Sequence, residues 1–96
     1  MELHQVRYFL ALCEEKNFTR AARRCGVSQP SLSDAIRRLE QELGGQLFYR
    51  NRVNCRLSEL GQALRPHLEK LDQHARAARL HAAHFLDCAA ASAAAE

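Results

Sequence analysis

A regular series of apolar residues along the C-terminal part of the chain constrains its fold more than any other feature. Apolar side chains recur at steps of three or four residues between Leu57 and Phe85. This spacing places them on one stripe of an α-helix, close to the heptad seam of paired helices. A helix of about 28 residues extends about 40 Å, which is more than so small a domain can cover. We therefore expect the stripe to meet a second copy of the chain through Leu60, Leu64, Leu68, Leu71, Ala75, Ala78 and Phe85.

The same series divides the 96-residue chain into three parts. We expect a compact domain over residues 1–57, a dimerising helix over 58–88, and an alanine-rich tail over 89–96 that is either a frayed helix end or the start of a hinge. Ser58 is a favourable N-cap for the long helix, because its hydroxyl can accept a free backbone N–H. Pro66 lies inside the predicted helix, where we expect it to bend the axis.

Positive charge is concentrated in the middle of the chain. The formal net charge is +3, but residues 16–56 carry nine basic and three acidic side chains, a local net charge of +6 between two acidic flanks. Eight of these nine bases are arginines, whose guanidinium groups suit contacts with phosphates and base edges. The alternative interpretation is an ordinary solvated helix face. This distribution favours an acidic partner more strongly than the total charge does.

Three helices and a hairpin are predicted before the apolar stripe. Residues 2–15 have the spacing of an amphipathic helix, and a short second helix begins with Thr19 as its N-cap and ends at Gly26, which can adopt positive φ. A third helix starts at Ser28 and ends at a pair of glycines. Alternating apolar residues over 49–57 then give a weak hairpin signal. The predicted fold class is mainly α with a small β-hairpin.

The second and third helices meet the requirements of a helix-turn-helix motif. Ala22 is small enough for the helices to cross closely, and Gly26 gives the turn a permissive backbone. Apolar residues occupy the expected contact points, namely Ala21, Cys25, Val27, Leu32 and Ala35. The start of the third helix must present short polar side chains to base edges and phosphates. The residues that do so are Gln29, Ser31, Ser33 and Asp34.

Five segments of the chain carry a resemblance to a known family. They are Phe18–Ala22, Val27–Ser33, Ile36–Glu40, Leu47–Arg50 and Leu57–Gly61. In these segments the chain closely resembles the DNA-binding domain of LysR-type transcriptional regulators, and the resemblance extends from Met1 to about Phe85. It implies a winged helix-turn-helix and a linker helix that pairs antiparallel with its mate in a homodimer. Two recognition helices would then enter successive major grooves of an interrupted palindrome in double-stranded DNA.

The resemblance also implies which residues contact DNA. Those at base-facing positions are Gln29, Pro30, Ser33 and Asp34, with Ser31 beside them. Gln29 can form a bidentate contact with adenine, and Pro30 can contact a thymine methyl group. Residues suited to phosphates are Thr19, Arg20, Ser28, Arg37, Arg38 and Arg50. Arg52 or Asn54 is suited to a wing that probes the minor groove.

Three departures from the family pattern bear on these assignments. Asp34 stands where many members have a basic or neutral residue, and it either accepts a hydrogen bond from cytosine or pairs with Arg38 one turn on. Val53 occupies a wing position that is frequently arginine, so Arg52 either takes a different path to the groove or contacts only phosphate. The family's effector-binding domain does not follow. We therefore expect a fragment, an engineered domain or a naturally truncated regulator.

Other chemistry has weaker support in the sequence. The chain has neither a signal peptide nor an apolar run of membrane-spanning length, so we expect a cytoplasmic protein. It has no phosphate-binding loop or catalytic arrangement, which argues against an enzyme, a cofactor or a small-molecule site. His81, His84 and Cys88 share one helix face, yet we expect exposed histidines rather than a metal site. Cys55 in the wing is a candidate exposed thiol without a resolving partner.

One functional alternative is a truncated regulator that dimerises with a full-length partner and thereby titrates it. A pure titrator need not retain the residues of a recognition surface, whereas this chain has Gln29, Ser33, Arg37 and Arg50 together. We therefore favour a sequence-specific DNA-binding domain that acts as a homodimer. Higher oligomers would require an effector domain.

Overall fold

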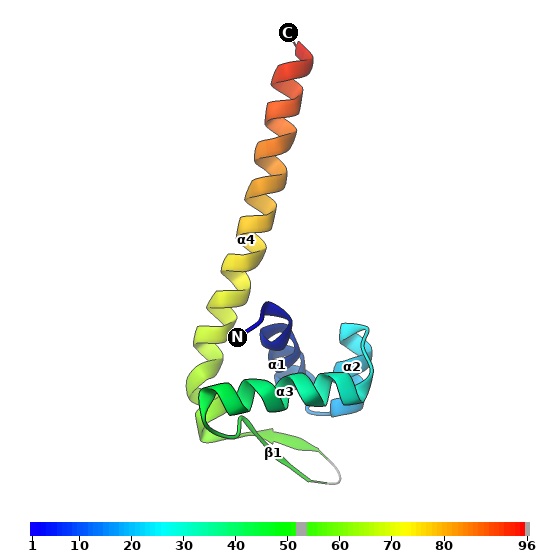
Figure 1. Ribbon diagram of the computed structural model, residues 1–96, viewed down its shortest axis with the longest axis vertical. Helices are drawn as coiled ribbons and strands as arrows, with labels where there is room; N and C mark the ends of the chain where they lie inside the picture. Colours follow the sequence, from blue (N-terminus) through cyan, green and yellow to red (C-terminus); the bar gives the residue numbers. More distant parts are fainter. Residues whose placement is uncertain (52–53, 96) are drawn as a thin grey trace.

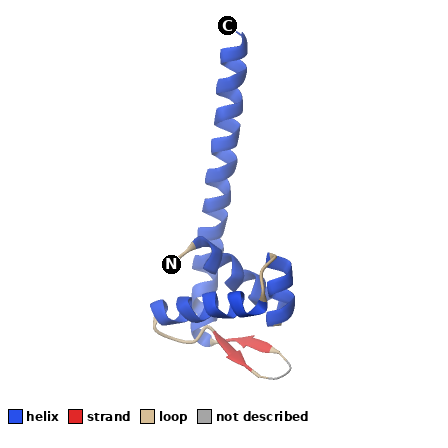
Figure 2. Cartoon of the chain, turned by 45° about the vertical axis from the view of Figure 1, so that its right-hand side comes forward, coloured by secondary structure: helices blue, strands red, loops and turns tan. Residues whose placement is uncertain are grey.

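The computed structural model describes residues 1–51 and 54–95, with side chains through Ala91. Its elements follow in the order α1 (Leu3–Glu15), α2 (Phe18–Cys25), α3 (Gln29–Leu43), β1 (Phe48–Arg50), β2 (Cys55–Leu57) and α4 (Glu59–Ala95). The three short helices form a body at the foot of α4, and the hairpin projects from the end of the body opposite the C-terminus (Figures 1 and 2). The predicted class, mainly α with a hairpin wing and a long final helix, is confirmed.

The core lies where α1 and α3 pack against each other and against the wing. The apolar stripe of α1 supplies Val6, Phe9 and Leu12, and α3 supplies Leu32, Ile36 and Leu39, all of them fully buried. Burial of such side chains contributes about 2 kcal/mol each. The ring of Phe9 lies 5.4 Å from that of Phe48 in β1, so the same core also holds the wing.

The N-cap of α2 is Asn17, and the prediction that Thr19 caps this helix is wrong. The backbone of Asn17 is extended, and its Oδ1 accepts the N–H of Arg20 at 2.8 Å. Helix formation from Phe18 places that ring against the core, one turn before Ala21 and Ala22. The earlier start therefore buries apolar surface that a start after Thr19 would leave outside the helix.

The turn between α2 and α3 has the predicted form. Gly26 has a φ of +71°, and its N–H bonds back to the carbonyls of Ala22 and Arg23. Ser28 then caps α3, because its Oγ accepts the N–H of Ser31 at 3.2 Å. Ala22 is 2% exposed, which fits its predicted place at the crossing of the two helices.

The wing is an antiparallel pair in which Phe48 faces Leu57 and Arg50 faces Cys55. The expectation of an exposed Cys55 is wrong, since its side chain is 4% exposed and belongs to the core. The N–H of Cys55 also bonds to the carbonyl of Lys16 at the end of α1, which draws the strand onto the body. Burial raises the pKa of this thiol and disfavours the reactive thiolate. Arg52 and Val53 lie outside the described residues.

The long helix α4 is joined to the root of the wing at its first turn. Ser58 caps it as predicted, because its Oγ accepts the N–H of Gly61 at 3.0 Å. The same hydroxyl donates to the carbonyl of Gln46 at 2.6 Å. A side chain at Gly61 would collide with the carbonyl oxygen of Leu47, so this glycine allows the helix to approach the wing closely. The foot of α4 and the base of the hairpin thus form one joint.

Beyond this joint α4 continues as one helix through Pro66 and past residue 88 to Ala95, about 55 Å in all. Leu68 is 4% exposed in the chain's own core, and Leu60 and Leu64 pack against it. The first part of the predicted stripe is therefore covered by this chain's own body, contrary to the expectation that the whole stripe meets a partner. Among the helices described, none is long and apolar enough to cross a membrane.

Candidate nucleic-acid interface

The predicted base-contacting residues lie at the exposed start of α3. Gln29, Pro30, Ser31 and Asp34 are exposed and Ser33 is half-buried, because the helix turns Leu32, Ala35 and Ile36 inward. Hydrogen bonds connect pairs of these polar side chains. Gln29 Nε2 donates to Ser33 Oγ at 3.4 Å, and Ser28 Oγ donates to Ser31 Oγ at 2.8 Å. The surface is polar, exposed and carried by a rigid element.

The predicted contacts divide between two sides of α3. On one side, a hollow of about 260 Å³ lies between α2, α3 and the wing, and we call it the wing hollow. The predicted residues that line it are Thr19, Gln29, Ser33, Arg50 and Asn54. On the other side, Ser31, Asp34 and Arg38 line a separate hollow beside the start of α1. The structure thus brings together, around the wing hollow, two residues predicted to contact bases and three predicted to contact the DNA backbone or the minor groove.

Asp34 forms the intrahelical ion pair that was one of its two alternatives. Its Oδ2 lies 3.0 Å from Nε of Arg38, one helical turn further on. The Asp34 and Arg38 side chains are 53% and 71% exposed, and a pair of this kind contributes only about 0.3–0.5 kcal/mol. Either partner can therefore exchange the other for a group on DNA at little cost.

Two of the predicted phosphate contacts form bonds to another element of the body. Arg20 Nη2 donates to the carbonyl of Glu15 at 3.0 Å, which closes the end of α1. Arg50 Nη2 donates to Glu40 Oε1 at 3.1 Å. Thr19, Ser28 and Arg37 are exposed. Sequence reasoning missed the role of Glu40, because nothing local to that residue indicates a partner in the wing.

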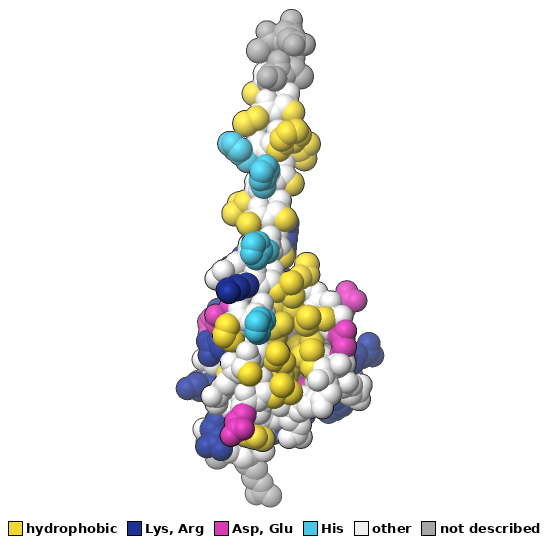
Figure 3. Space-filling view, turned by 90° about the vertical axis from the view of Figure 1, so that its left-hand side faces the viewer, with side chains coloured by type: hydrophobic (Ala, Val, Ile, Leu, Met, Phe, Trp, Pro, Cys, Tyr) yellow, Lys and Arg dark blue, Asp and Glu magenta, His cyan; other side chains and the backbone are white. Residues whose placement is uncertain are grey.

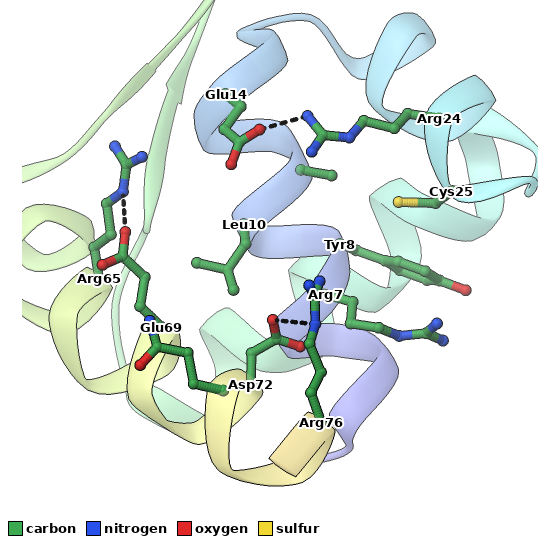
Figure 4. Close-up of a pocket in the computed structure, with 12 residues that line it drawn as sticks. Arg7, Tyr8, Leu10, Glu14, Arg24, Cys25, Arg65, Glu69, Asp72 and Arg76 are labelled. Atoms are coloured by element: carbon green, nitrogen blue, oxygen red, sulfur yellow. Dashed lines mark hydrogen bonds and ion pairs between the residues drawn. The ribbon is translucent and has the colours of Figure 1, made fainter. Parts of the chain in front are cut away.

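A larger hollow of about 430 Å³ lies away from this surface, between α1 and α4 (Figure 4). Ion pairs cross or border it, from Arg24 to Glu14 at 2.6 Å and from Arg76 to Asp72 at 3.1 Å. The first of these connects α2 to α1 and the second lies within α4. Four arginines and three acids line the hollow, and three of the arginines pair with these acids. The formal net charge of +1 is small for a phosphate-binding surface.

The histidines of α4 do not gather into a metal site within the part of the chain that the structure describes. Cys88 Sγ lies 3.7 Å from His84 Nε2, but among the described residues no third ligand converges on this exposed pair.

The three-helix body, the exposed start of α3 and the adjoining hairpin define a winged helix-turn-helix DNA-binding domain. The chain belongs to the LysR family of bacterial regulatory helix-turn-helix proteins, whose family model matches residues 3–62. This match covers the body, the wing and the first turn of α4.

The curated relatives that this chain resembles include transcriptional regulators and a regulatory protein. The chain is 51% identical over 63 residues to the HTH-type transcriptional regulator BudR of Klebsiella aerogenes, a match that covers 66% of this chain and 44% of BudR. It is 41% identical over 87 residues to the small neutral protease regulatory protein of Streptomyces coelicolor, covering 86% of this chain and 26% of that protein. The chain thus spans less than half the length of these relatives.

Solved structures with this fold include complexes with DNA. The DNA-binding domain of BenM bound to catB site 1 DNA has a TM-score of 0.82 and 34% identity, covering 88% of this chain and 96% of that chain. The complex of the CbnR DNA-binding domain with DNA has a TM-score of 0.78 and 31% identity, covering 88% of this chain and 99% of that chain.

Proposed function

We propose that this chain binds double-stranded DNA sequence-specifically, with α3 in the major groove and the wing beside it. The observation that carries the proposal is the group of polar side chains around the wing hollow. Gln29 and Ser33 come from the start of α3, a helix of suitable size for the groove, and Arg50 and Asn54 come from the wing. The DNA complexes of the similar BenM and CbnR domains support it. A DNA-binding regulator of this bacterial family would act in the cytoplasm, where the chromosome lies.

In this proposal the base contacts come from Gln29, Pro30, Ser33 and Asp34, with Ser31 beside them. Thr19, Ser28, Arg37 and Arg38 supply phosphate contacts, and Arg50 adds one beside the wing. Arg20 is a less direct contact in this proposal, because its guanidinium donates to the carbonyl of Glu15 at the end of α1. Asn54, which lines the wing hollow, and Arg52 remain the proposed contacts of the wing with the minor groove.

We also propose that the active form is a homodimer that reads an interrupted palindrome. The support is the part of α4 that extends beyond the body, where Phe85 and Leu86 are each 64% exposed and Leu71 is 39% exposed. Hydrophobic side chains also gather beside the foot of α4 (Figure 3). Exposed apolar surface of this kind is typical of an interface. The proposed contacts are Leu71, Ala75, Ala78 and Phe85, whereas Leu60, Leu64 and Leu68 pack in the chain's own core.

Selection of bound sites from random double-stranded DNA by this 96-residue chain tests the proposal. We expect enrichment of two similar half-sites related by a two-fold axis and separated by a fixed spacing. Enrichment of a single half-site would contradict the dimeric mode, and no enrichment would contradict sequence-specific binding. A dimer that enriches no DNA would favour the titrator instead.

A further inference from the structure

One carboxylate joins the recognition helix to the wing. Glu40 lies in the last turn of α3, and its side chain is only 11% exposed. Its Oε2 accepts the backbone N–H of Leu47, just before β1, at 2.7 Å. Its Oε1 accepts Nη2 of Arg50, within β1, at 3.1 Å. The two oxygens therefore fix two points along the wing strand relative to α3.

The backbone of Glu40, like its side chain, accepts two hydrogen bonds. Its carbonyl oxygen accepts the N–H of Gly44 at 2.9 Å and the N–H of Gly45 at 3.1 Å. Gly44 has a φ of +85°, so the chain leaves the helix at this point. One residue thus ends α3, holds the turn that follows and anchors the strand beyond it.

The guanidinium held by Glu40 borders the predicted base-reading residues. Arg50 Cζ lies 5.2 Å from the centre of the Phe18 ring at the start of α2, and Arg50 lines the wing hollow with Gln29 and Ser33. Its side chain is 38% exposed. A guanidinium has five N–H donors, so the bond to Glu40 leaves others for a phosphate.

We propose that Glu40 is a positioning residue for DNA recognition, which sets the wing and the Arg50 guanidinium relative to the base-reading residues of α3. The proposal rests on the proposed function. It can be separated from a simple charge effect, because a carboxylate near phosphates repels them and by itself weakens binding to every DNA. Repulsion and positioning therefore predict different results when Glu40 is changed.

Two substitutions separate charge from geometry. Glu40→Asp keeps the charge but is one methylene shorter, so its oxygens cannot reach Leu47 and Arg50 as they do now. Glu40→Gln keeps the length and an acceptor oxygen but loses the ion pair. Glu42→Gln is the matched control, because it removes the same charge from the same helix. The carboxylate of Glu42 pairs with the N-terminal amine at 2.8 Å and not with the wing.

The measurement is the ratio of affinities for the selected site and for scrambled DNA at one salt concentration. We expect this ratio to fall about tenfold in Glu40→Asp and in Glu40→Gln, because each loses a charge-assisted hydrogen bond, and to stay constant in Glu42→Gln. A Glu40→Asp variant that matches the wild type would overturn the proposal. So would a Glu40→Gln variant that binds both DNAs more tightly by the same factor.

Amide NMR spectra of the unbound variants test the positioning step without DNA. We expect the Leu47 and Tyr49 signals to move in Glu40→Asp while those of Val6 and Arg7 in α1 stay in place. Unchanged wing signals would overturn the proposal, even if the wild type selects no DNA and the proposed function fails. If the α1 signals also move, Arg50→Lys repeats both tests, because it keeps the charge and loses the planar fork.

Discussion

At the scale of single residues, the start of α3 combines an exposed surface with side chains that make few contacts needed for the stability of the fold. Gln29 and Ser33 bond to each other at 3.4 Å, a weak contact that a base edge can replace. Arg20 and Arg50, by contrast, carry bonds that hold the body together. Substitutions at the first pair should therefore affect recognition with little change in stability, whereas substitutions at the two arginines should affect both.

Gln29→Ala removes the side chain best suited to a bidentate contact with adenine. We expect the discrimination at one position of each half-site to fall by roughly 1–3 kcal/mol, with no change in affinity for random DNA. Repeating the site selection with the variant measures this loss. Gln41→Ala is the control, because Gln41 is the same side chain on the exposed surface of α3, about three turns further on. Equal losses on selected and random DNA would rule out base reading by Gln29.

Cys13 should make folding stability depend on pH in alkaline solution. Burial raises the pKa of its thiol from 9.0 to about 11. Between these values the folded state keeps a proton that the unfolded state releases, so the stabilising contribution is complete below about pH 9 and declines as pH rises toward about 11. Urea unfolding at pH 8 and pH 10 measures the decline. It should be smaller in Cys13→Ala, and an equal decline in both proteins would contradict this assignment.

At the scale of elements, short-range signals determine most of what the sequence predicts. Gly26, Ser28 and Ser58 are identified correctly because each acts on backbone groups within five residues of itself. The N-cap of α2 was misplaced because Asn17 and Thr19 are both good caps, and the packing of Phe18 decides between them. Local pattern reveals which residue types can end or begin a helix, but not which start buries more surface.

Asn17→Ala should destabilise the body by about 1 kcal/mol, because α2 is only eight residues long and loses the side chain that accepts the N–H of Arg20. Thr19→Ala should change stability by less than about 0.5 kcal/mol, since Thr19 is exposed and is not the cap. Urea unfolding of the two variants compares them directly. A larger loss in Thr19→Ala would reverse the assignment of the cap.

Apart from the N-cap of α2, the contacts that sequence reasoning missed join residues from different elements. Cys55 is buried because its strand bonds to Lys16 at the end of α1. Leu68 is buried because the body reaches that turn of α4. In both cases the residue type and the local spacing of apolar residues are compatible with a buried or an exposed side chain. Only the arrangement of the elements determines which of the two is found. The bonds of Glu40 to the wing belong to the same class.

At the scale of the whole molecule, α4 divides into a covered part and a bare part. The molecule measures 62 × 25 × 19 Å, and its length comes from the half of α4 that lies beyond the body (Figure 1). Leu68 belongs to the core, whereas Leu80, Phe85 and Leu86 are more than 60% exposed. Substitutions in the two parts should therefore have different consequences, with loss of folding in the first and loss of association in the second.

Phe85→Asp should convert the proposed dimer to monomers without unfolding the body. Phe85 lies on the stripe with Leu71 and Ala78, and a charge there would face the partner helix. Leu80→Asp is the matched control, because Leu80 is 72% exposed and lies on the opposite side of α4 from that stripe. Sedimentation equilibrium gives the mass of each variant. A dimer that survives Phe85→Asp, or that Leu80→Asp disrupts equally, would refute the stripe as the interface.

The joint between α4 and the wing has a mechanical consequence. Ser58 bonds to Gln46 and Leu47 at the base of the hairpin, and Gly61 packs against the same segment. Leu60, Leu64 and Leu68 hold the first part of this helix against the body. The bare part beyond Asp72 is an arm about 35 Å long, so a tilt of about 10° displaces its far end by about 6 Å. A force applied near Ala95 therefore reaches the hairpin through the packed first part of α4 and the bonds of Ser58. The free end of α4 is therefore mechanically coupled to the hairpin, the element that we propose lies beside DNA.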